Sequence, residues 1–222
     1  RVSAEYTASE YTGADVIFPM EECIDKSDAS YLTSDDYDYQ SGQAAAVKHG
    51  DKISMTVDVP ETALYWIGFD YISYDESILP IELAFTVDGK YPFYETRNLE
   101  FETNWLGDEK ADKDRYGNEI VALPDKDISW QSKYLGDASY RYSQPLMVQL
   151  TKGEHRFGIK VDEGTLMLGN ITLAAPKSVA EYTGSEKADG RGLITIEAEN
   201  FYGRNDSSIH ATGEYDKRLS PL

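Results

Sequence analysis

A strictly alternating segment in the first third of the chain most constrains the fold. From Lys52 to Val59 polar and apolar residues alternate without a break, and Pro60 ends the segment. Successive side chains of a β-strand point to opposite faces of a sheet, so this pattern predicts a strand with one buried face. Proline lacks the N–H that a continuing strand would need.

Further segments have the composition of strands and are separated by turns. They are residues 64–71, 82–87, 146–150, 155–161 and 166–173. Asp88-Gly89 predicts a tight turn into a strand at residues 91–94, and residues 151–154 predict a second hairpin turn. A short helix is expected only at residues 94–100. This organisation predicts an all-β fold, an antiparallel β-sandwich.

The alternation also predicts the core. We expect burial of Met55, Val57, Val59, Ile67, Phe69, Phe85, Val148, Phe157 and Ile159, and of Trp66 within its strand. Between residues 104 and 143 the strand pattern lapses, and a stretch of this length without regular structure is usually functional or mobile.

Charge and cysteine content exclude several classes of function. The 222 residues include 40 acidic and 21 basic side chains, for a formal charge of −19. Nucleic acids and anionic membrane surfaces would be repelled by such a chain. No apolar stretch is long enough to span a bilayer. Because no charged and then apolar leader pattern follows Arg1, we expect this residue to begin a mature fragment. The single cysteine, Cys23, excludes an intrachain disulfide and a Cys-based zinc site, and we expect it to be buried.

The chain repeats itself. The hexapeptide at residues 5–10 recurs with one change at residues 181–186, and Glu21 recurs as Glu199. A repeat at this distance indicates tandem homologous domains. We therefore predict a lead-in (1–14), a complete sandwich (15–176), a linker (177–192) and the start of a second, truncated sandwich (193–222).

Several segments of the chain resemble segments of known protein families. Residues 57–61 with Leu64-Tyr65, and residues 194–201 (Ile-Thr-Ile-Glu-Ala-Glu-Asn-Phe), are similar to strands of galactose-binding-like sandwiches, the fold of family 6 and 35 carbohydrate-binding modules. Residues 85–93, 98–101, 114–119 and 150–155 resemble the tandem N-terminal sandwich domains of extracellular solute-binding (ABC transporter) proteins of Gram-positive bacteria. The resemblance implies a jelly roll outside the cell, held at the surface by an anchor outside this sequence.

Sugar binding in such modules depends on aromatic faces that stack on pyranose rings, with polar groups that orient the hydroxyls. Trp105 and Trp130 lie in the long stretch without a strand pattern, where such a platform is expected. The alternative is that both rings pack this stretch onto the sandwich. Tyr134, Tyr140 and Tyr142 are further candidates with the same alternative.

The resemblance also implies a structural calcium ion near the first strand. Glu197 and Glu199 of the second copy match the paired acids of the family, whereas the first copy has Pro19 and keeps only Glu21. Gly169, beside Asn170, stands at the late-strand position that carries Asp in relatives. No other cofactor is expected. The acidic run at residues 35–38 and the charged run at residues 112–117 are interpreted as solvated surface.

Catalytic motifs are absent from the sequence. It has no phosphate-binding loop, no G-x-S-x-G and no H-E-x-x-H, and neighbouring acids such as Asp70 with Asp75 or Glu100 with Glu102 are expected by chance among so many carboxylates. The prediction is therefore a non-catalytic carbohydrate-binding-type module attached to a solute-binding or carbohydrate-active protein, with a glycan as partner. The alternatives are an architectural spacer without ligand and, third, a fragment of a glycoside-active enzyme.

The truncated copy leads to one further prediction. Residues 193–201 should form a strand whose partners lie in the missing part of the second sandwich, and an unpaired strand recruits another one. We expect it to pair with another polypeptide, either a neighbouring copy or the cleaved remainder of the same protein. The alternative is pairing with the edge of the first sandwich.

Overall fold

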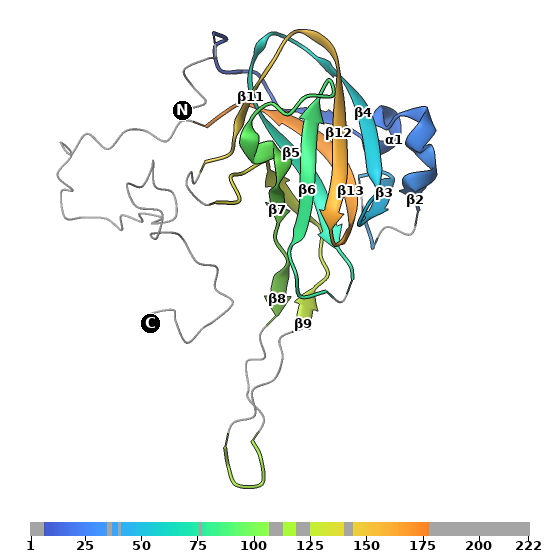
Figure 1. The fold of residues 1–222 in the computed structure, drawn as a ribbon, viewed down its shortest axis with the longest axis vertical. Helices are drawn as coiled ribbons and strands as arrows, with labels where there is room; N and C mark the ends of the chain where they lie inside the picture. Colours follow the sequence, from blue (N-terminus) through green and yellow to red (C-terminus); the bar gives the residue numbers. More distant parts are fainter. Residues whose placement is uncertain are drawn as a thin grey trace, which may run out of the picture.

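Two antiparallel sheets lie face to face in the computed structural model (Figure 1). The structure describes residues 7–34, 37–39, 41–75, 77–106, 113–118, 125–139 and 144–177. The larger sheet has the order β10 (Gln131–Tyr134), β5 (Ala63–Ser73), β13 (Thr165–Ala174), β3 (Ala44–Lys48) and β2 (Leu32–Thr33). In the same sheet β1 (Val16–Phe18) also pairs with β13, and β11 (Met147–Leu150) also pairs with β5.

The smaller sheet has four strands, and two short strands form a separate hairpin. Its order is β4 (Lys52–Val59), β12 (Gly153–Glu163), β6 (Ile81–Val87) and β7 (Leu99–Phe101). The hairpin consists of β8 (Asn104–Leu106) and β9 (Asp125–Asp127). The helical elements are α1 (Met20–Cys23) and the 3-10 helices η2 (Lys26–Tyr31) and η3 (Tyr94–Arg97). The predicted all-β antiparallel sandwich is confirmed.

The main core lies between the two sheets. All nine residues expected there are buried, and Phe85 contacts both Phe69 and Phe157 edge-on, with ring centroids 5.9 and 5.1 Å apart. Cys23 is also buried in this core, as expected. Burial of this apolar surface is the main term that stabilises a sandwich of this kind.

β5 separates the main core from a second, outward face of the larger sheet. Its odd-numbered residues from Tyr65 to Tyr71 belong to the main core, so its even-numbered residues point away from the smaller sheet. Trp66 is one of these. It is buried, as expected, but on the outward face against Tyr134. A small apolar cluster of Ala44, Ile72 and Met167 lies on the same outward face.

Two local predictions were wrong. Residues 91–94 form no strand: the turn at Asp88-Gly89 closes with a single bridge between Val87 and Lys90, and η3 follows, so the expected helix at 94–100 is one short 3-10 turn. Residues 104–143 contain three strands, β8, β9 and β10, where none was predicted. These strands have three or four residues each, too short to produce a visible period, and β9 and β10 are mostly polar.

A buried ion pair fixes the β8–β9 hairpin to the sandwich. Lys126 Nζ of β9 donates to the carboxylate of Asp75 at 2.9 Å and to the backbone carbonyls of Asp75 and Ser77, and the Lys126 side chain is only 8% exposed. In the described part of the chain, no helix has the length and apolarity needed to cross a membrane. The predicted linker and second copy, with the strand at residues 193–201, lie outside the described residues except for the linker's first residue, Lys177, and stay predictions.

Candidate functional site

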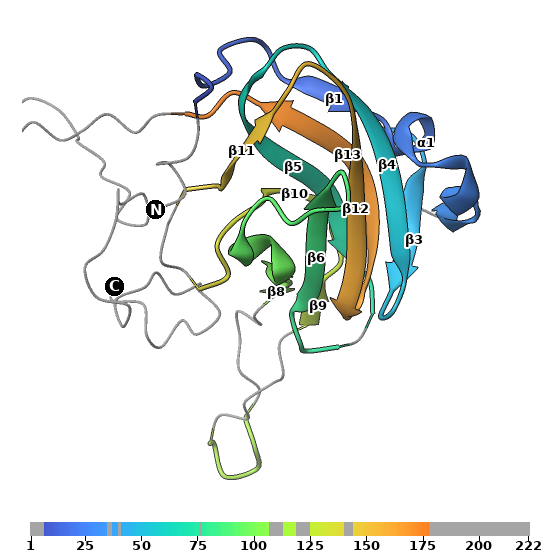
Figure 2. The same cartoon turned by 45° about the horizontal axis from the view of Figure 1, so that its top comes forward.

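The edge strand β10 carries Ser132 and Tyr134 on one side, and Trp130 directly precedes the strand. They are alternate residues, so their side chains share a face, and the register places Ser132 opposite Asp70 and Tyr134 opposite Gly68 of β5. Figure 2 shows β10 beside β5. At about 3.3 Å per residue, the two aromatic side chains are roughly 13 Å apart along the chain. We call Trp130, Ser132, Tyr134 and Asp70 the β10 face.

Tyr134 forms one end of the β10 face. Its ring packs on Trp66 with centroids 5.6 Å apart and covers Gly68, where a Cβ would lie 3.0 Å from Tyr134 Cδ1. Burial, with a smaller effect of the Asp15 carboxylate, raises the pKa of Tyr134, so its hydroxyl is neutral. Glycine at position 68 lets this ring lie flat against the sheet.

Trp130 forms the other end. Its ring packs against Tyr39 with centroids 4.0 Å apart and planes tilted by 30°. Both rings lie on the small cluster of Ala44, Ile72 and Met167, and both stay partly exposed. Trp130 is therefore supported from below by the sheet without being enclosed in the main core.

Asp70 is the polar centre of the face. Its carboxylate accepts a hydrogen bond from Tyr39 Oη at 2.8 Å and another from Ser132 Oγ. Burial raises the pKa of Tyr39, and the neighbouring Asp70 carboxylate raises it further against the opposing effect of the Asn170 N–H. Tyr39 is thus a neutral hydroxyl that donates to Asp70. Each carboxylate oxygen keeps a second lone pair for another donor.

A β-bulge in β13 lies next to Asp70. The register of β13 against β5 shifts between Leu168 and Ile171, so Gly169 and Asn170 stand where one residue would be expected. The Asn170 N–H donates to Tyr39 Oη at 2.8 Å. The side-chain Oδ1 of Asn170 is buried and has no hydrogen-bond partner among the described residues.

The structure brings together only some of the predicted platform residues. Trp130 and Tyr134 share the β10 face, whereas Trp105 lies in β8, opposite Lys126 of β9 and in a different sheet. Tyr140 and Tyr142 lie outside the described residues. The sequence analysis did not single out Tyr39 or Ser132 and treated Asp70 as a chance neighbour of Asp75. Two features of the sequence could have pointed to this site. They are the single acid, Asp70, within the apolar run of β5 and the Gly169-Asn170 interruption of the apolar run of β13.

The predicted calcium residues are not gathered into one site in the described part of the chain. Glu21 is exposed in α1, and its carboxylate accepts the backbone N–H of Gln43. Among the described residues, no three His, Cys, Asp or Glu side chains are grouped as a metal site would require. Glu197 and Glu199 lie outside the described residues, so calcium binding stays a prediction.

The neighbouring acids noted in the sequence have separate partners. Asp70 bonds to Tyr39 and Ser132, whereas Asp75 pairs with Lys126. Glu102 pairs with Lys133 at 3.3 Å. Burial raises the pKa of Glu100; Lys133 opposes the shift, and the carboxylates of Glu102 and Glu82 add to it.

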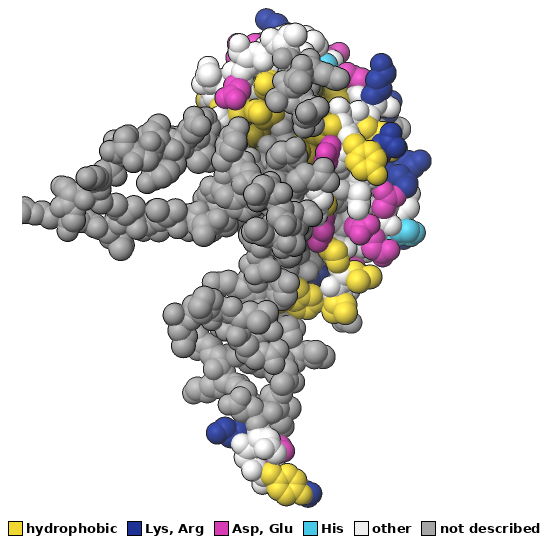
Figure 3. Space-filling model, turned by 60° about the vertical axis from the view of Figure 1, so that its left-hand side comes forward, with side chains coloured by type: hydrophobic (Ala, Val, Ile, Leu, Met, Phe, Trp, Pro, Cys, Tyr) yellow, Lys and Arg dark blue, Asp and Glu magenta, His cyan; other side chains and the backbone are white. Residues whose placement is uncertain are grey.

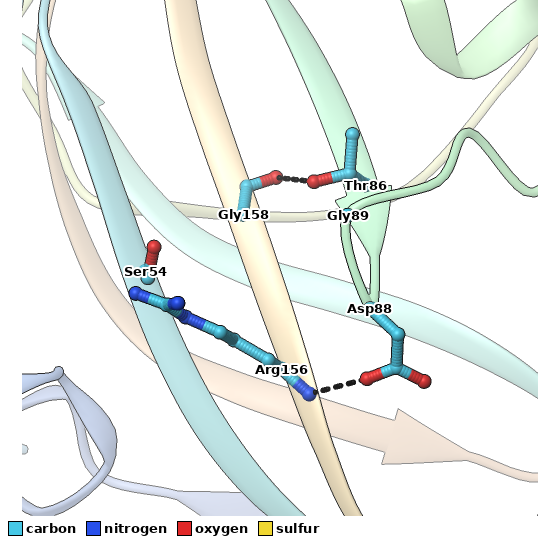
Figure 4. Close-up of a pocket in the computed structure, with 6 residues that line it drawn as sticks. All are labelled: Ser54, Thr86, Asp88, Gly89, Arg156 and Gly158. Atoms are coloured by element: carbon cyan, nitrogen blue, oxygen red, sulfur yellow. Dashed lines mark hydrogen bonds between the residues drawn. The ribbon is translucent and has the colours of Figure 1, made fainter.

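A polar pocket lies on the outward face of the smaller sheet (Figure 4). Its volume is about 450 Å³, and it is lined by Ser54, Thr86, Asp88, Gly89, Arg156 and Gly158. The polar groups bond to one another: Thr86 Oγ1 donates to the Gly158 carbonyl, and Asp88 accepts the Arg156 N–H. The Arg156 guanidinium pairs with Asp25 at 2.7 Å. None of the lining residues is aromatic, so this pocket offers no stacking surface.

Residues 113–118 form a turn beyond the β8–β9 hairpin. Asp114 accepts the backbone N–H groups of Tyr116 and Asn118 and the Asn118 side-chain amide, and these bonds lower its pKa. Figure 3 shows hydrophobic and basic side chains at the end of this turn, where Arg115 lies over the exposed ring of Tyr116. The Asp114 carboxylate is engaged within the turn, which agrees with the interpretation of a solvated, charged loop.

Comparison with known proteins finds similar shapes only. No protein-family model and no curated protein matches the sequence. A family 35 carbohydrate-binding module from Clostridium thermocellum superposes with a TM-score of 0.46 and 13% identity, over 73% of this chain and 99% of the module. A GH26-CBM35 β-(1,4)-mannanase from Podospora anserina gives a TM-score of 0.45 and 14% identity, over 77% of this chain. An exo-β-1,3-galactanase from Phanerochaete chrysosporium gives 0.42 and 11%, over 74% of this chain.

The chain spans 29% of the mannanase and 30% of the galactanase. All three identities are below 25% and all three TM-scores below 0.5, so neither a ligand nor an activity follows from these similarities.

Proposed function

We propose that the chain is a non-catalytic carbohydrate-binding module and that the β10 face is its sugar site. The observation that carries this proposal is the arrangement of two partly exposed aromatic side chains on either side of a carboxylate and a hydroxyl. Trp130 and Tyr134 offer ring faces to the C–H groups of pyranose rings. The Asp70 carboxylate keeps lone pairs that can accept from sugar hydroxyls, and Ser132 Oγ, whose proton is donated to Asp70, can accept a further hydrogen bond.

The length of the face favours an oligosaccharide over a single sugar. The separation of roughly 13 Å between Trp130 and Tyr134 leaves room for more than one ring along β10. Each stacked ring contributes a modest free energy, and hydroxyl contacts replace bonds to water. We expect Kd values of about 10⁻³–10⁻⁵ M, corresponding to roughly 4–7 kcal/mol.

The proposal extends to the setting of the module. We place it outside the cell, beside a solute-binding or carbohydrate-active domain, as the family resemblance of residues 85–93 and 150–155 implies. The structural calcium ion of the family belongs to the same proposal and would involve Glu21 or the second copy's Glu197 and Glu199. A glycan search is therefore made with and without added calcium.

A glycan array with the full chain identifies the ligand, and calorimetric titration with mannotriose, β-1,3-galactotriose and the best array ligand measures its affinity. We expect Trp130→Ala to abolish binding with little change in the melting temperature, because the ring lies outside the main core. Trp105→Ala is the matched control and should keep full affinity. Binding that survives Trp130→Ala but is lost in Trp105→Ala would place the site elsewhere, and no binding to any glycan would favour the spacer.

A further inference from the structure

Tyr39 packs on the β10 face and forms hydrogen bonds with residues beside it. Its ring lies on Trp130 with centroids 4.0 Å apart. Its single hydroxyl donates to Asp70 Oδ2 and accepts the N–H of Asn170, both at 2.8 Å. A ring stacked on an indole, with one oxygen that both donates and accepts, is also the contact set of a stacked pyranose with one hydroxyl.

The bulge in β13 leaves space for the Tyr39 hydroxyl beside Gly169. A Cβ at Gly169 would lie 2.5 Å from Tyr39 Cζ, so any larger residue would collide with the ring. Glycine therefore lets a hydroxyl-bearing ring reach the backbone N–H of Asn170. The space at the bulge suits a ring with a hydroxyl, whether it belongs to the protein or to a ligand.

The side-chain oxygen of Asn170 lacks a hydrogen-bond donor, and Tyr39 does not provide one. The residue is only 9% exposed, and its Oδ1 has no hydrogen-bond partner among the described residues. The hydroxyl proton of Tyr39 is already donated to Asp70, so Tyr39 has no second donor for Asn170. A buried acceptor without a partner is unfavourable, and a ligand with a further hydroxyl would relieve this.

The backbone preceding Tyr39 is also unfavourable. Tyr37 and Asp38 have φ values of 50° and 61°, in the left-handed region that side-chain-bearing residues rarely adopt. Contacts such as that between the Tyr37 and Tyr74 rings, with centroids 5.4 Å apart, hold this strain, which is released if the segment leaves the sheet. The contact between Tyr39 and Trp130 is thus one that a better-matched ligand can replace.

We infer that Tyr39 is an internal stand-in for the ligand, displaced by a neutral sugar with two adjacent hydroxyls. This inference rests on the proposed function of the β10 face. One sugar hydroxyl takes the place of Tyr39 Oη between Asp70 and the Asn170 N–H, and its neighbour donates to Asn170 Oδ1. Acidic sugars are disfavoured because the Asp70 carboxylate faces the ligand and the chain carries a formal charge of −19.

Removing the stand-in should strengthen sugar binding. If Tyr39 covers Trp130 about nine-tenths of the time, the apparent Kd is about tenfold above that of the open site. We therefore expect Tyr39→Ala to bind mannotriose or β-1,3-galactotriose about tenfold more tightly than the unaltered chain. Tyr39→Phe, which keeps the stacked ring but loses both hydrogen bonds, should lie between the two.

The experiment is calorimetric titration of the full chain with these two trisaccharides and with trigalacturonic acid as the acidic probe. Asn170→Ala should weaken binding of the neutral probes several-fold, and trigalacturonic acid should bind no variant. Tyr94→Ala, an exposed tyrosine of η3, is the control and should change nothing. Melting temperatures establish that each variant is folded.

The outcomes separate this inference from the proposed function. Loss of binding in Trp130→Ala together with unchanged or weaker binding in Tyr39→Ala and Tyr39→Phe would overturn the stand-in and leave the sugar site intact. Tight binding of trigalacturonic acid would overturn the predicted ligand class. Absence of binding in the unaltered chain, Tyr39→Ala and Tyr39→Phe alike would refute both proposals.

Discussion

Replacing Phe157 by Ala tests how the two sheets are held together. Phe157 lies at the centre of β12, is fully buried, and contacts Phe85 edge-on at 5.1 Å. Its register neighbours are Met55 of β4 and Val87 of β6, so the ring anchors the middle of the smaller sheet. Removal of a fully enclosed Phe side chain costs about 3–5 kcal/mol, which includes the cavity left behind.

The expected loss is a large part of the stability of a domain, which is roughly 5–15 kcal/mol. For a chain of this size each kcal/mol lowers the melting temperature by about 2–4 °C, so the variant should melt roughly 6–20 °C lower. Urea denaturation followed by tryptophan fluorescence measures the free energy of unfolding, and a thermal scan measures the shift.

Two controls distinguish burial from a general effect of substitution. Phe157→Leu keeps most of the volume and should cost under about 2 kcal/mol. Tyr94→Ala removes a ring that is 80% exposed and should change the stability by less than about 0.5 kcal/mol. A loss below about 1 kcal/mol in Phe157→Ala would refute the placement of this ring in the core between the sheets.

Three further predictions concern single groups. Lys126→Met should lower the free energy of unfolding by about 2 kcal/mol in urea denaturation, because it removes a charged hydrogen-bond donor that is only 8% exposed and joins β9 to Asp75. A change smaller than about 0.5 kcal/mol would contradict this. Burial raises the pKa of Cys23 to about 12, so the thiol should react with an aromatic disulfide reagent at pH 8 only after unfolding, and rapid labelling of the native chain would show it to be accessible. Burial alone would raise the pKa of Asp88, but the hydrogen bonds from the Arg156 N–H and His155 outweigh it and lower that pKa below its ordinary value of 3.8. Asp88 therefore contributes stability above pH 3.8 that is lost as the pH falls through its lowered value, and the stability difference between the unaltered chain and Asp88→Asn should shrink below about pH 4; a difference independent of pH from 3 to 7 would be inconsistent with the shift.

The strands β4, β6 and β12 could be predicted from the sequence because one face of each lies in the core, whereas β5 and β13, buried on both faces, could be predicted from their apolar composition. β4 has the predicted bounds, and β6 and β12 begin or end within two residues of those predicted. Alternation of side chains is a local property that the sequence displays directly. The tight turn at Asp88-Gly89 was likewise predictable, since both residues adopt the positive φ values that this dipeptide favours, although no strand follows it.

β8, β9 and β10 could not be predicted because their position depends on distant partners. β10 pairs with β5, about 60 residues earlier, and β9 is fixed by Lys126 to Asp75. Neither contact leaves a periodic pattern in a strand of three or four mostly polar residues. A stretch without such a pattern can therefore contain short strands joined by loops.

The candidate site was predictable in part for the same reason. Trp130 and Tyr134 could be selected because they are aromatic side chains in a polar stretch that shows no strand pattern to bury them. Tyr39 lies 31 residues before Asp70 and 131 before Asn170, and only the folded sheet brings these three together. The acidic residues around Tyr39 suggested a solvated surface and concealed its contact with Trp130.

The central claim, that sugar binds at the β10 face, is tested most directly by the indole N–H signals of the three tryptophans, Trp66, Trp105 and Trp130. The full chain is labelled with ¹⁵N-tryptophan, each signal is assigned by substitution, and the best glycan of the array is titrated to saturation. We predict the largest shift at Trp130, a smaller one at Trp66 beneath Tyr134, and none at Trp105. A saturable shift confined to Trp105, or saturation without any change at Trp130, would contradict the account.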